Sequence, residues 1–420
     1  MSLALTDEER AMMAGSRGAA IAMASRILGE TAAMLGAERL VAVTSSHVDG
    51  CLYHGDSGVH FAERLAAEGG RVAVPTTLNV GALDLLHPGR VHFDQRTADM
   101  ARRMMVAYEQ LGCTPSWTCA PYQAGHRPKL GEHVAWGESN AVVFCNSVLG
   151  ARTNRLGDFL DVCAALCARA PYTGLHRDEN RQARLVVDTG ELSDGLKRLD
   201  AFYPVLGAWL GAEAGAEVAA IVGMPTAIPE DCLKALGAAA ASSGAVGLFH
   251  IVGVTPEAPD LVAATGGKTP ERTIVLTPAM LRLARDRLST AAAGTDRIDA
   301  VAVGSPHFSP AEFAALDRLV GGTRFKVPFY ACTGRAVLGE IERSGVLARL
   351  GEAGVEIVTD TCVVVAPILP KAGGVLMTNS GKFAHYATPN TGFATIYGSL
   401  ADCVASAIHG RVSRDESLWA

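Results

Sequence analysis

Three cysteines stand where an apolar or extended segment of the chain gives way to a turn: Cys119, Cys332 and Cys362. Each has a threonine beside it, whose hydroxyl could hydrogen-bond to an inorganic sulfide. Three thiolates from distant parts of a chain can hold an iron–sulfur cluster and leave one iron open as a Lewis acid for a substrate oxygen. Since no C-x-x-C pair anchors the set, three unrelated strand-end cysteines are the alternative.

One other cysteine is a rival ligand. Cys51 lies in a polar loop near His47 and could bind metal or line a site. The remaining cysteines are expected to fill core positions as small hydrophobic residues: Cys113, Cys145, Cys163, Cys167, Cys232 and Cys403. A separate interpretation is a cysteine-nucleophile enzyme acting through Cys119, which predicts activity without iron and irreversible loss on thiol alkylation.

A polar loop over residues 45–58 carries groups able to move protons or bind an anion. His47, Asp49 and Ser57 are its candidate catalytic residues. Ser57 and the next residue, a glycine, stand near the expected start of a helix, where backbone N–H groups attract anions. Histidine and carboxylates are also common metal ligands, but the spacing here fits no standard metal motif. A solvated turn is the remaining alternative.

Two arginines follow the segment 138–144, which is expected to form an apolar helix. Arg152 and Arg155 flank Thr153 and Asn154, and guanidinium groups pair with a carboxylate through two parallel hydrogen bonds. This group is therefore a candidate carboxylate clamp. The alternative is a helix C-terminus whose arginines offset the helix dipole.

The segment Asn379-Ser380-Gly381-Lys382 follows the apolar residues 375–377. A Walker motif needs glycine at position 376, which is leucine, and Ser or Thr at position 383, which is phenylalanine. Residues 266–269 fail the same test at position 262, and neither a G-x-S-x-G elbow nor a G-x-G-x-x-G fingerprint is found. A nucleotide-triphosphatase is therefore rejected. Lys382 is a candidate catalytic residue that binds a substrate anion, with a surface lysine as the alternative.

The elements that position these residues follow from the apolar pattern. From about residue 180, short apolar segments alternate with helical ones, which predicts parallel sheets whose carboxyl ends collect ligands. Strands are expected at 40–44, 72–74, 185–187, 216–222, 246–252, 298–303, 327–331 and 355–358, with a turn at 45–50. Helices are expected at 7–14, 18–35, 97–111, within 135–149, and at 158–168, 229–241, 278–292 and 310–319. Residues 392–407 are expected to form strand, turn and helix.

Composition sets the class of protein. A chain of 420 residues with 49% hydrophobic content can form two closely packed α/β domains. We place one in residues 1–190 plus 365–420, with the substrate loops, and the second in 191–364, with cluster cysteines. A net charge of −6 without clustered Lys or Arg argues against nucleic acid. No signal peptide and no membrane span is expected, so the predicted location is the cytoplasm. Thr6 and Glu9 have the spacing of a helix capping box.

Several of these segments, in this order, resemble the aconitase X family. They are residues 46–50, 118–122, 135–144, 150–155, 332–335, 360–364 and 379–382. The resemblance covers most of the chain and implies an aconitase-like α/β fold, with parallel-sheet domains around an iron–sulfur cluster and with the swivelling domain absent from this chain. It implies that Cys119, Cys332 and Cys362 hold the cluster, with 2Fe–2S favoured and 4Fe–4S as the alternative. It also adds Ser139, Asn140 and Ser380 to the candidate substrate-binding residues.

The resemblance further implies a hydro-lyase. Bacterial members similar to this chain dehydrate cis-3-hydroxy-L-proline to Δ1-pyrroline-2-carboxylate, and archaeal members act on a phosphorylated mevalonate. The loop at residues 49–58 resembles the bacterial kind, and the Ala-, Gly- and Arg-rich composition fits a bacterium of high GC content, so the resemblance implies hydroxyproline as the substrate. A chain of this length has room for the large part alone, which implies a separate small swivelling-domain subunit that carries the proposed base. Phosphomevalonate dehydratase and a non-catalytic iron–sulfur regulatory protein are the alternatives.

Overall fold

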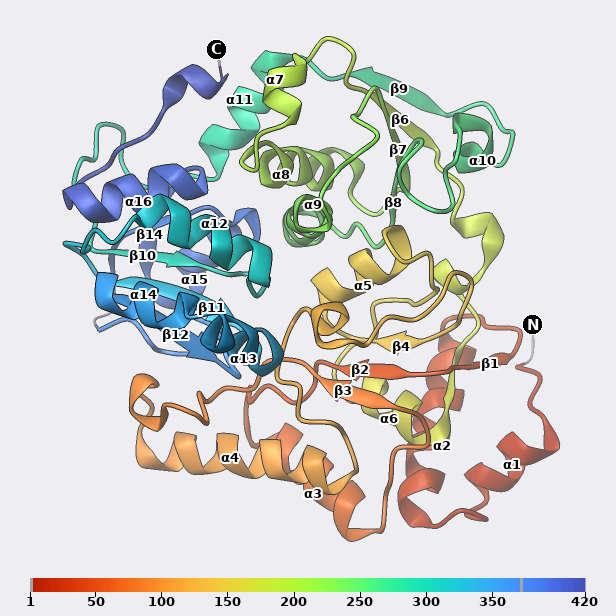
Figure 1. The fold of residues 1–420 in the computed structure, drawn as a ribbon. Helices are drawn as coiled ribbons and strands as arrows, with labels where there is room; N and C mark the ends of the chain where they lie inside the picture. Colours follow the sequence, from red (N-terminus) through yellow and green to blue (C-terminus); the bar gives the residue numbers. More distant parts are fainter. Residues whose placement is uncertain (1–2, 371–372, 420) are drawn as a thin grey trace. The chain divides into compact units, whose positions relative to one another are not determined.

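The computed structural model describes residues 3–370 and 373–419 and divides the chain into two compact units (Figure 1). Unit 1 comprises Met1–Leu83 and Phe93–Gln182, and unit 2 comprises Asp84–His92 and Ala183–Ala420. Within the described residues, no helix has the length and apolar character that a membrane crossing needs.

Unit 1 is built on a small parallel sheet in the order β3-β2-β4, formed by β2 (Ser46–Val48), β3 (Thr76–Leu78) and β4 (Ala135–Trp136). A separate antiparallel pair joins β1 (Leu40–Ala42) to β5 (Arg169–Pro171). The helices of this unit are α1 (Asp7–Met13), α2 (Ala19–Met34), α3 (Asp56–Ala67), α4 (Gln95–Gln110), α5 (Ser139–Ser147) and α6 (Leu160–Cys167). The predicted capping box at the start of α1 is confirmed, since the Thr6 hydroxyl accepts from the Glu9 N–H and the Glu9 carboxylate accepts from the Thr6 N–H.

Two local predictions for unit 1 were wrong. The expected turn at 45–50 contains the central strand β2, and the expected strand at 72–74 lies four residues later, as β3. β2 carries Ser46 and His47 in buried positions, and their polar atoms are satisfied locally: the Ser46 hydroxyl donates to the Ala135 carbonyl (2.6 Å) and His47 pairs with Thr77 (2.8 Å). A buried strand whose polar groups have such partners has no apolar pattern by which to recognise it.

Unit 2 contains two parallel sheets. The first, in the order β8-β7-β6-β9, is formed by β6 (Leu185–Asp188), β7 (Ala219–Val222), β8 (Phe249–Ile251) and β9 (Arg272–Val275). The second, in the order β12-β11-β10-β13-β14, is formed by β10 (Ala300–Val303), β11 (Phe329–Thr333), β12 (Val355–Thr359), β13 (Gly374–Thr378) and β14 (Phe393–Tyr397). Parallel strands buried on both faces explain the nearly continuous apolar runs seen in the sequence.

Helices separate these strands along the chain and cover both sheets (Figure 1). They are α7 (Asp194–Lys197), α8 (Phe202–Ala214), α9 (Glu230–Ser243), α10 (Leu261–Thr265), α11 (Pro278–Arg287), α12 (Pro310–Val320), α13 (Arg335–Arg343), α14 (Val346–Ala353), α15 (Gly381–Thr391) and α16 (Leu400–His409). Helix α8 packs along α9, and α15 packs on α9. A Cβ atom at Gly207 would overlap the Leu236 carbonyl, and one at Gly381 would lie 2.8 Å from the Ala239 Cβ. Helix α8 therefore packs directly on the backbone of α9, and α15 lies against a single methyl group of α9.

The predicted domain boundaries differ from this division. We placed residues 365–420 with the N-terminal part, but β13 pairs with β10 and β14 extends the same sheet. Residues from Ala183 onward therefore form unit 2, which also includes the short segment Asp84–His92. The order of strands within a parallel sheet depends on contacts between distant segments, and the spacing of apolar runs does not record it.

Candidate functional site

Two of the predicted cluster cysteines lie at the carboxyl ends of strands in the five-stranded sheet of unit 2. Cys332 is near the end of β11, and Cys362 follows β12, the strand that pairs with β11. Both side chains are buried. The Cys332 carbonyl accepts the Phe308 N–H (3.0 Å). The chain thus presents two thiols at the carboxyl ends of adjacent parallel strands, where ligands collect in such sheets.

The turn before Cys362 is held by a set of polar contacts. Asp360 has the left-handed backbone angle φ 62° and is fully buried. Its carboxylate accepts two hydrogen bonds from Arg335, at 2.6 and 2.8 Å. Asp84, also buried, accepts from the backbone N–H and the hydroxyl of Thr359, at 3.2 and 3.0 Å. Two carboxylates therefore fix the backbone that leads into Cys362.

The residue beside Cys362 supplies a test of whether this turn suits a cluster. The Thr361 hydroxyl is buried and has no hydrogen-bond partner within the described part of the chain. An unsatisfied buried hydroxyl costs about 1–3 kcal/mol, so it is expected to meet an acceptor. A sulfide or a thiolate bound to iron is such an acceptor. The residues here fit an iron–sulfur group.

Cys119 belongs to unit 1 and is buried there. It follows Trp117, whose φ is 41°, and its carbonyl accepts from the Asn140 side-chain amide (3.0 Å). The same amide nitrogen donates to the Tyr122 hydroxyl (3.2 Å), while the buried Asn140 carbonyl oxygen has no partner among the described residues. The structure thus brings together Cys119 and Asn140, which were predicted from different segments.

His47 lies at the centre of the unit 1 sheet and is fully buried. Its Nδ1 is 2.8 Å from the Thr77 hydroxyl. Burial first, and then the neighbouring His126 ring, lower the His47 pKa to about 3, and Glu138 opposes the shift. His47 is therefore a neutral imidazole near pH 7.

Asp49 follows β2 and belongs to a carboxylate group that also includes Glu138 and Asp161. The Asn79 amide nitrogen donates to Asp49 and to Glu138, the latter at 3.3 Å. Asp161 accepts the backbone N–H groups of Asp49 (2.7 Å) and Gly50 (3.0 Å). Burial and then the Glu138 charge raise the Asp49 pKa to about 8, so this carboxyl can carry a proton at neutral pH.

Asn79, Glu138 and Asp161 were not among our predicted site residues. Asn79 follows β3 and Glu138 follows β4 at the same carboxyl edge as Asp49. Had β3 been placed correctly, the rule that ligands gather at strand ends would have pointed to Asn79. Asp161 lies within helix α6, and its role depends on a contact that no local pattern reveals.

Ser57 and Cys51 have different surroundings from His47 and Asp49. Ser57 is exposed in the first turn of α3, while Cys51 is fully buried. The Cys51 thiol donates to the carbonyls of Asn79 (3.4 Å) and Val48 (3.6 Å). Burial raises the Cys51 pKa well above its ordinary value, which favours a neutral thiol over a metal-binding thiolate.

The two arginines of the predicted clamp have different surroundings. Arg152 pairs with Asp178, and Arg155 is exposed. Thr153 is fully buried and accepts the Trp136 N–H (3.0 Å), and the Asn154 amide donates to the Thr173 carbonyl (3.0 Å). Thr153 and Asn154 therefore anchor the segment. Because α5 ends at Ser147, neither arginine lies in its last turn.

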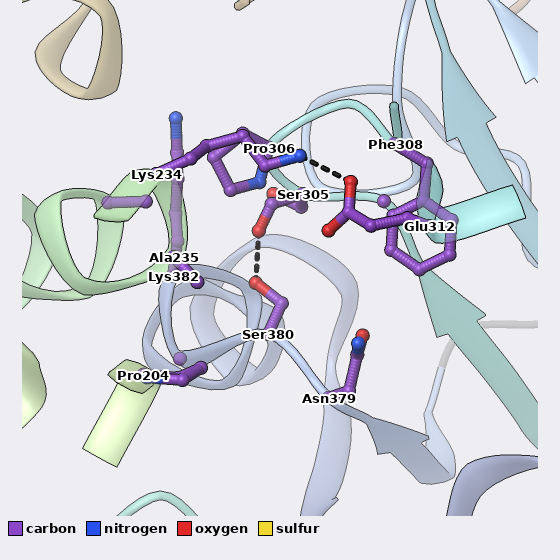
Figure 2. A pocket seen from close by; sticks show the side chains of 13 residues that line it. Pro204, Lys234, Ala235, Ser305, Pro306, Phe308, Glu312, Asn379, Ser380 and Lys382 are labelled. Atoms are coloured by element: carbon purple, nitrogen blue, oxygen red, sulfur yellow. Dashed lines mark hydrogen bonds and ion pairs between the residues drawn. The ribbon is translucent and has the colours of Figure 1, made fainter. Parts of the chain in front are cut away.

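Ser380 and Lys382 follow β13, at the carboxyl ends of the same parallel strands as the two cysteines of unit 2. The Ser380 hydroxyl caps α15 by accepting the Phe383 N–H (2.9 Å), and it donates to the Ser305 carbonyl. Figure 2 shows Lys382 at a small cavity that is also lined by Asn379.

A buried ion pair closes another side of this cavity. Lys234 pairs with Glu312, as Figure 2 shows, and with Asp231. Its ammonium also donates to the His307 carbonyl (3.1 Å). Burial raises the Glu312 pKa to about 7, although the Lys234 charge opposes that shift. The charge of Lys234 is matched by these two acidic partners. Lys382 is a second cation that lines the same cavity.

Comparison with known proteins agrees with this architecture. Three family models match the chain in sequence: Aconitase X first domain over residues 2–179, second domain over 183–286 and third domain over 298–409. A solved structure, the holo-form of aconitase X from Thermococcus kodakaraensis, is similar with a TM-score of 0.86 and 32% identity, covering 96% of this chain and all of that one.

Two curated relatives extend the comparison. Cis-3-hydroxy-L-proline dehydratase of Pseudomonas aeruginosa is 42% identical across 98% of this chain and 71% of its own length. The phosphomevalonate dehydratase large subunit of Methanothermobacter thermautotrophicus is 37% identical across 93% of this chain and 95% of its own length. Matches of this extent, to all three domain models and to relatives over more than 90% of this chain, leave one assignment: the chain belongs to the aconitase X family.

Proposed function

We propose that this protein is a hydro-lyase that removes water from cis-3-hydroxy-L-proline and yields Δ1-pyrroline-2-carboxylate. One observation carries the proposal: the relatives named cis-3-hydroxy-L-proline dehydratase, from Pseudomonas aeruginosa and Hypocrea jecorina, are 42% and 40% identical over nearly the whole chain. Relatives named phosphomevalonate dehydratase large subunit range from 31% to 37%.

The proposed cofactor is an iron–sulfur cluster, of the 2Fe–2S type, held by Cys119, Cys332 and Cys362. The support is chemical: all three thiols are buried, Cys332 and Cys362 lie at strand ends, and the Thr361 hydroxyl beside Cys362 has no hydrogen-bond partner among the described residues. When bound, the cluster would supply an iron Lewis acid for the leaving hydroxyl group.

The chain's own groups would handle protons and charge. Asp49, with its raised pKa, can hold a proton at neutral pH and donate it to a leaving hydroxide. The α-proton beside a carboxylate is poorly acidic, so its removal needs positive charge near the developing enediolate. Lys382, Arg152 and Arg155 are the residues proposed to supply that charge.

A small subunit with a swivelling domain is the proposed partner. The phosphomevalonate dehydratase relatives are named large subunits, and this chain covers 95% of the Methanothermobacter one. It covers 71% and 69% of the two hydroxyproline dehydratases.

The substrate assignment has a direct test. The assembled enzyme, purified without oxygen, is expected to form pyrroline carboxylate from cis-3-hydroxy-L-proline and to leave phosphomevalonate unchanged. The measurement is product formation from each substrate under the same conditions. Turnover of phosphomevalonate alone would make phosphomevalonate the substrate in place of hydroxyproline. An intact cluster without turnover of either compound would favour a regulatory protein.

The arginine clamp predicts a loss of catalysis without a loss of stability. Because Arg155 is exposed, Arg155→Ala is expected to leave the Tm unchanged. If Arg155 binds the substrate carboxylate, the same change should cost about 2–5 kcal/mol, on the order of 30- to 4000-fold in kcat/KM. Arg155→Lys should not rescue fully, since an ammonium cannot form the planar two-bond pair. Near-normal kcat/KM for Arg155→Ala would reject the clamp.

Arg152 provides the matched comparison. It is paired with Asp178, so Arg152→Ala is expected to lower the Tm even if Arg152 never contacts substrate. Kinetics and thermal midpoints of both variants, with iron content checked, separate anchoring of the segment from binding of the carboxylate.

A further inference from the structure

A threonine hydroxyl lies between two histidine rings in unit 1. Thr77 on β3, His47 on β2 and Trp136 on β4 are register partners across the parallel sheet, so their side chains share one face. His126 comes from the segment after Cys119, and its ring lies edge-on to Trp136 at 5.0 Å. The Thr77 Oγ1 is 2.8 Å from the His47 Nδ1 and 2.7 Å from the His126 Nδ1.

The two hydrogen bonds constrain the histidines. A hydroxyl has one proton, so Thr77 donates to one Nδ1 and accepts from the other. One ring therefore carries its proton on Nδ1 and the other on Nε2. Burial favours the neutral form of both rings, lowering the pKa of His47 to about 3 and of His126 to about 4. Two neutral imidazoles in opposite tautomers are the arrangement that this geometry requires.

The outer nitrogens of both rings have no internal partner. The Nε2 atoms of His47 and His126 are buried and make no hydrogen bond within the described residues. In opposite tautomers, one of these atoms presents a lone pair and the other presents an N–H. The pair can therefore accept a proton at one Nε2 and give up a proton at the other.

We propose that His47, Thr77 and His126 form a proton relay between these two Nε2 atoms. A proton binds the Nε2 lone pair of the first ring, and that ring passes its Nδ1 proton to the Thr77 oxygen. The Thr77 proton passes to the Nδ1 of the second ring, which releases its own proton from Nε2. Only bonds to hydrogen are broken and formed. After one passage the two rings have exchanged tautomers.

With the tautomers exchanged, the relay carries the next proton in the opposite direction. Dehydration releases one proton from carbon and consumes one at the departing hydroxide, so two passages in opposite directions restore the starting tautomers. This role in turnover rests on the proposed dehydratase function. The inner end of the relay is near Asp49, because Glu138 acts electrostatically on His47 and shares the Asn79 amide with Asp49. His47 is fully buried, whereas His126 is half-buried as a residue.

The first arm of the test observes the tautomers directly and needs no turnover. Nitrogen-15 NMR of the complete protein, with labelled histidine and with His47→Gln and His126→Gln for assignment, is expected to show one Nδ1–H and one Nε2–H ring. The same tautomer on both rings would overturn the relay. This result does not depend on the substrate. Failure of the relay can therefore be distinguished from failure of the proposed function.

The second arm uses a matched pair of variants. Thr77→Val keeps the shape of the side chain and removes the hydroxyl, whereas Thr77→Ser keeps the hydroxyl. Thr77→Val is expected to lower kcat about 10- to 100-fold with little change in KM, and Thr77→Ser to recover most of kcat. Iron content and Tm serve as controls. Equal kcat for Thr77→Val and wild type would overturn the relay even if the tautomers are opposite. If the wild type turns over phosphomevalonate instead, the same comparison is made with that substrate.

Discussion

Cys332→Ser and Cys362→Ser are each expected to remove iron and activity together. The serine hydroxyl is a poor substitute for a thiolate ligand, and the cluster is the proposed source of Lewis acidity. Loss of an interaction worth several kcal/mol corresponds to about a 100-fold or larger fall in kcat/KM. Iron content and visible and EPR spectra of anaerobically purified protein, compared with kinetics on the same samples, measure the effect. Cys119→Ser is expected to behave alike.

Two other cysteines supply matched controls. Cys403 is fully buried in α16, and Cys51 donates its thiol to backbone carbonyls. Serine at either position is expected to leave the protein brown, with a lower Tm as the main effect. Full iron in Cys332→Ser together with bleaching of Cys51→Ser would transfer the third ligand from Cys332 to Cys51.

The purified chain without a partner is expected to show less than about 1% of the activity of the assembled enzyme. A closing domain excludes water and completes the reacting groups, and such positioning supplies a large part of enzymatic rate enhancement. Co-expression with a small subunit of the swivelling-domain type, followed by co-purification and assay, is the measurement. The cluster spectrum of the isolated chain is the control, because it separates loss of the partner from loss of iron. Full activity of the isolated chain would contradict the proposed assembly.

Much of unit 2 could be predicted because its strands are buried on both faces. The apolar runs at 185–187, 298–303 and 355–358 coincide with β6, β10 and most of β12. The strand end that carries Cys332 follows from the same pattern. Pairing of β13 with β10 could not be predicted, because it depends on which distant strands meet.

Unit 1 was harder to predict because its central strand is polar. Ser46 and His47 have the composition of a loop, and only their cross-strand partners, Ala135 and Thr77, make a buried position acceptable. The same applies to the candidate site. His47 and Asp49 could be selected by type, whereas Asn79 and Asp161 act through contacts that link distant parts of the chain.

The close approach of α8, α9 and α15 has a mechanical consequence. Helices separated by long side chains can slide as those side chains change rotamer, but at Gly207 and Gly381 there is no such adjustable layer. A displacement of α9 must therefore carry α15 with it as one rigid body. Since α15 begins directly after Ser380 and carries Lys382 in its first turn, the position of that lysine is set by a helix more than a hundred residues away in the chain.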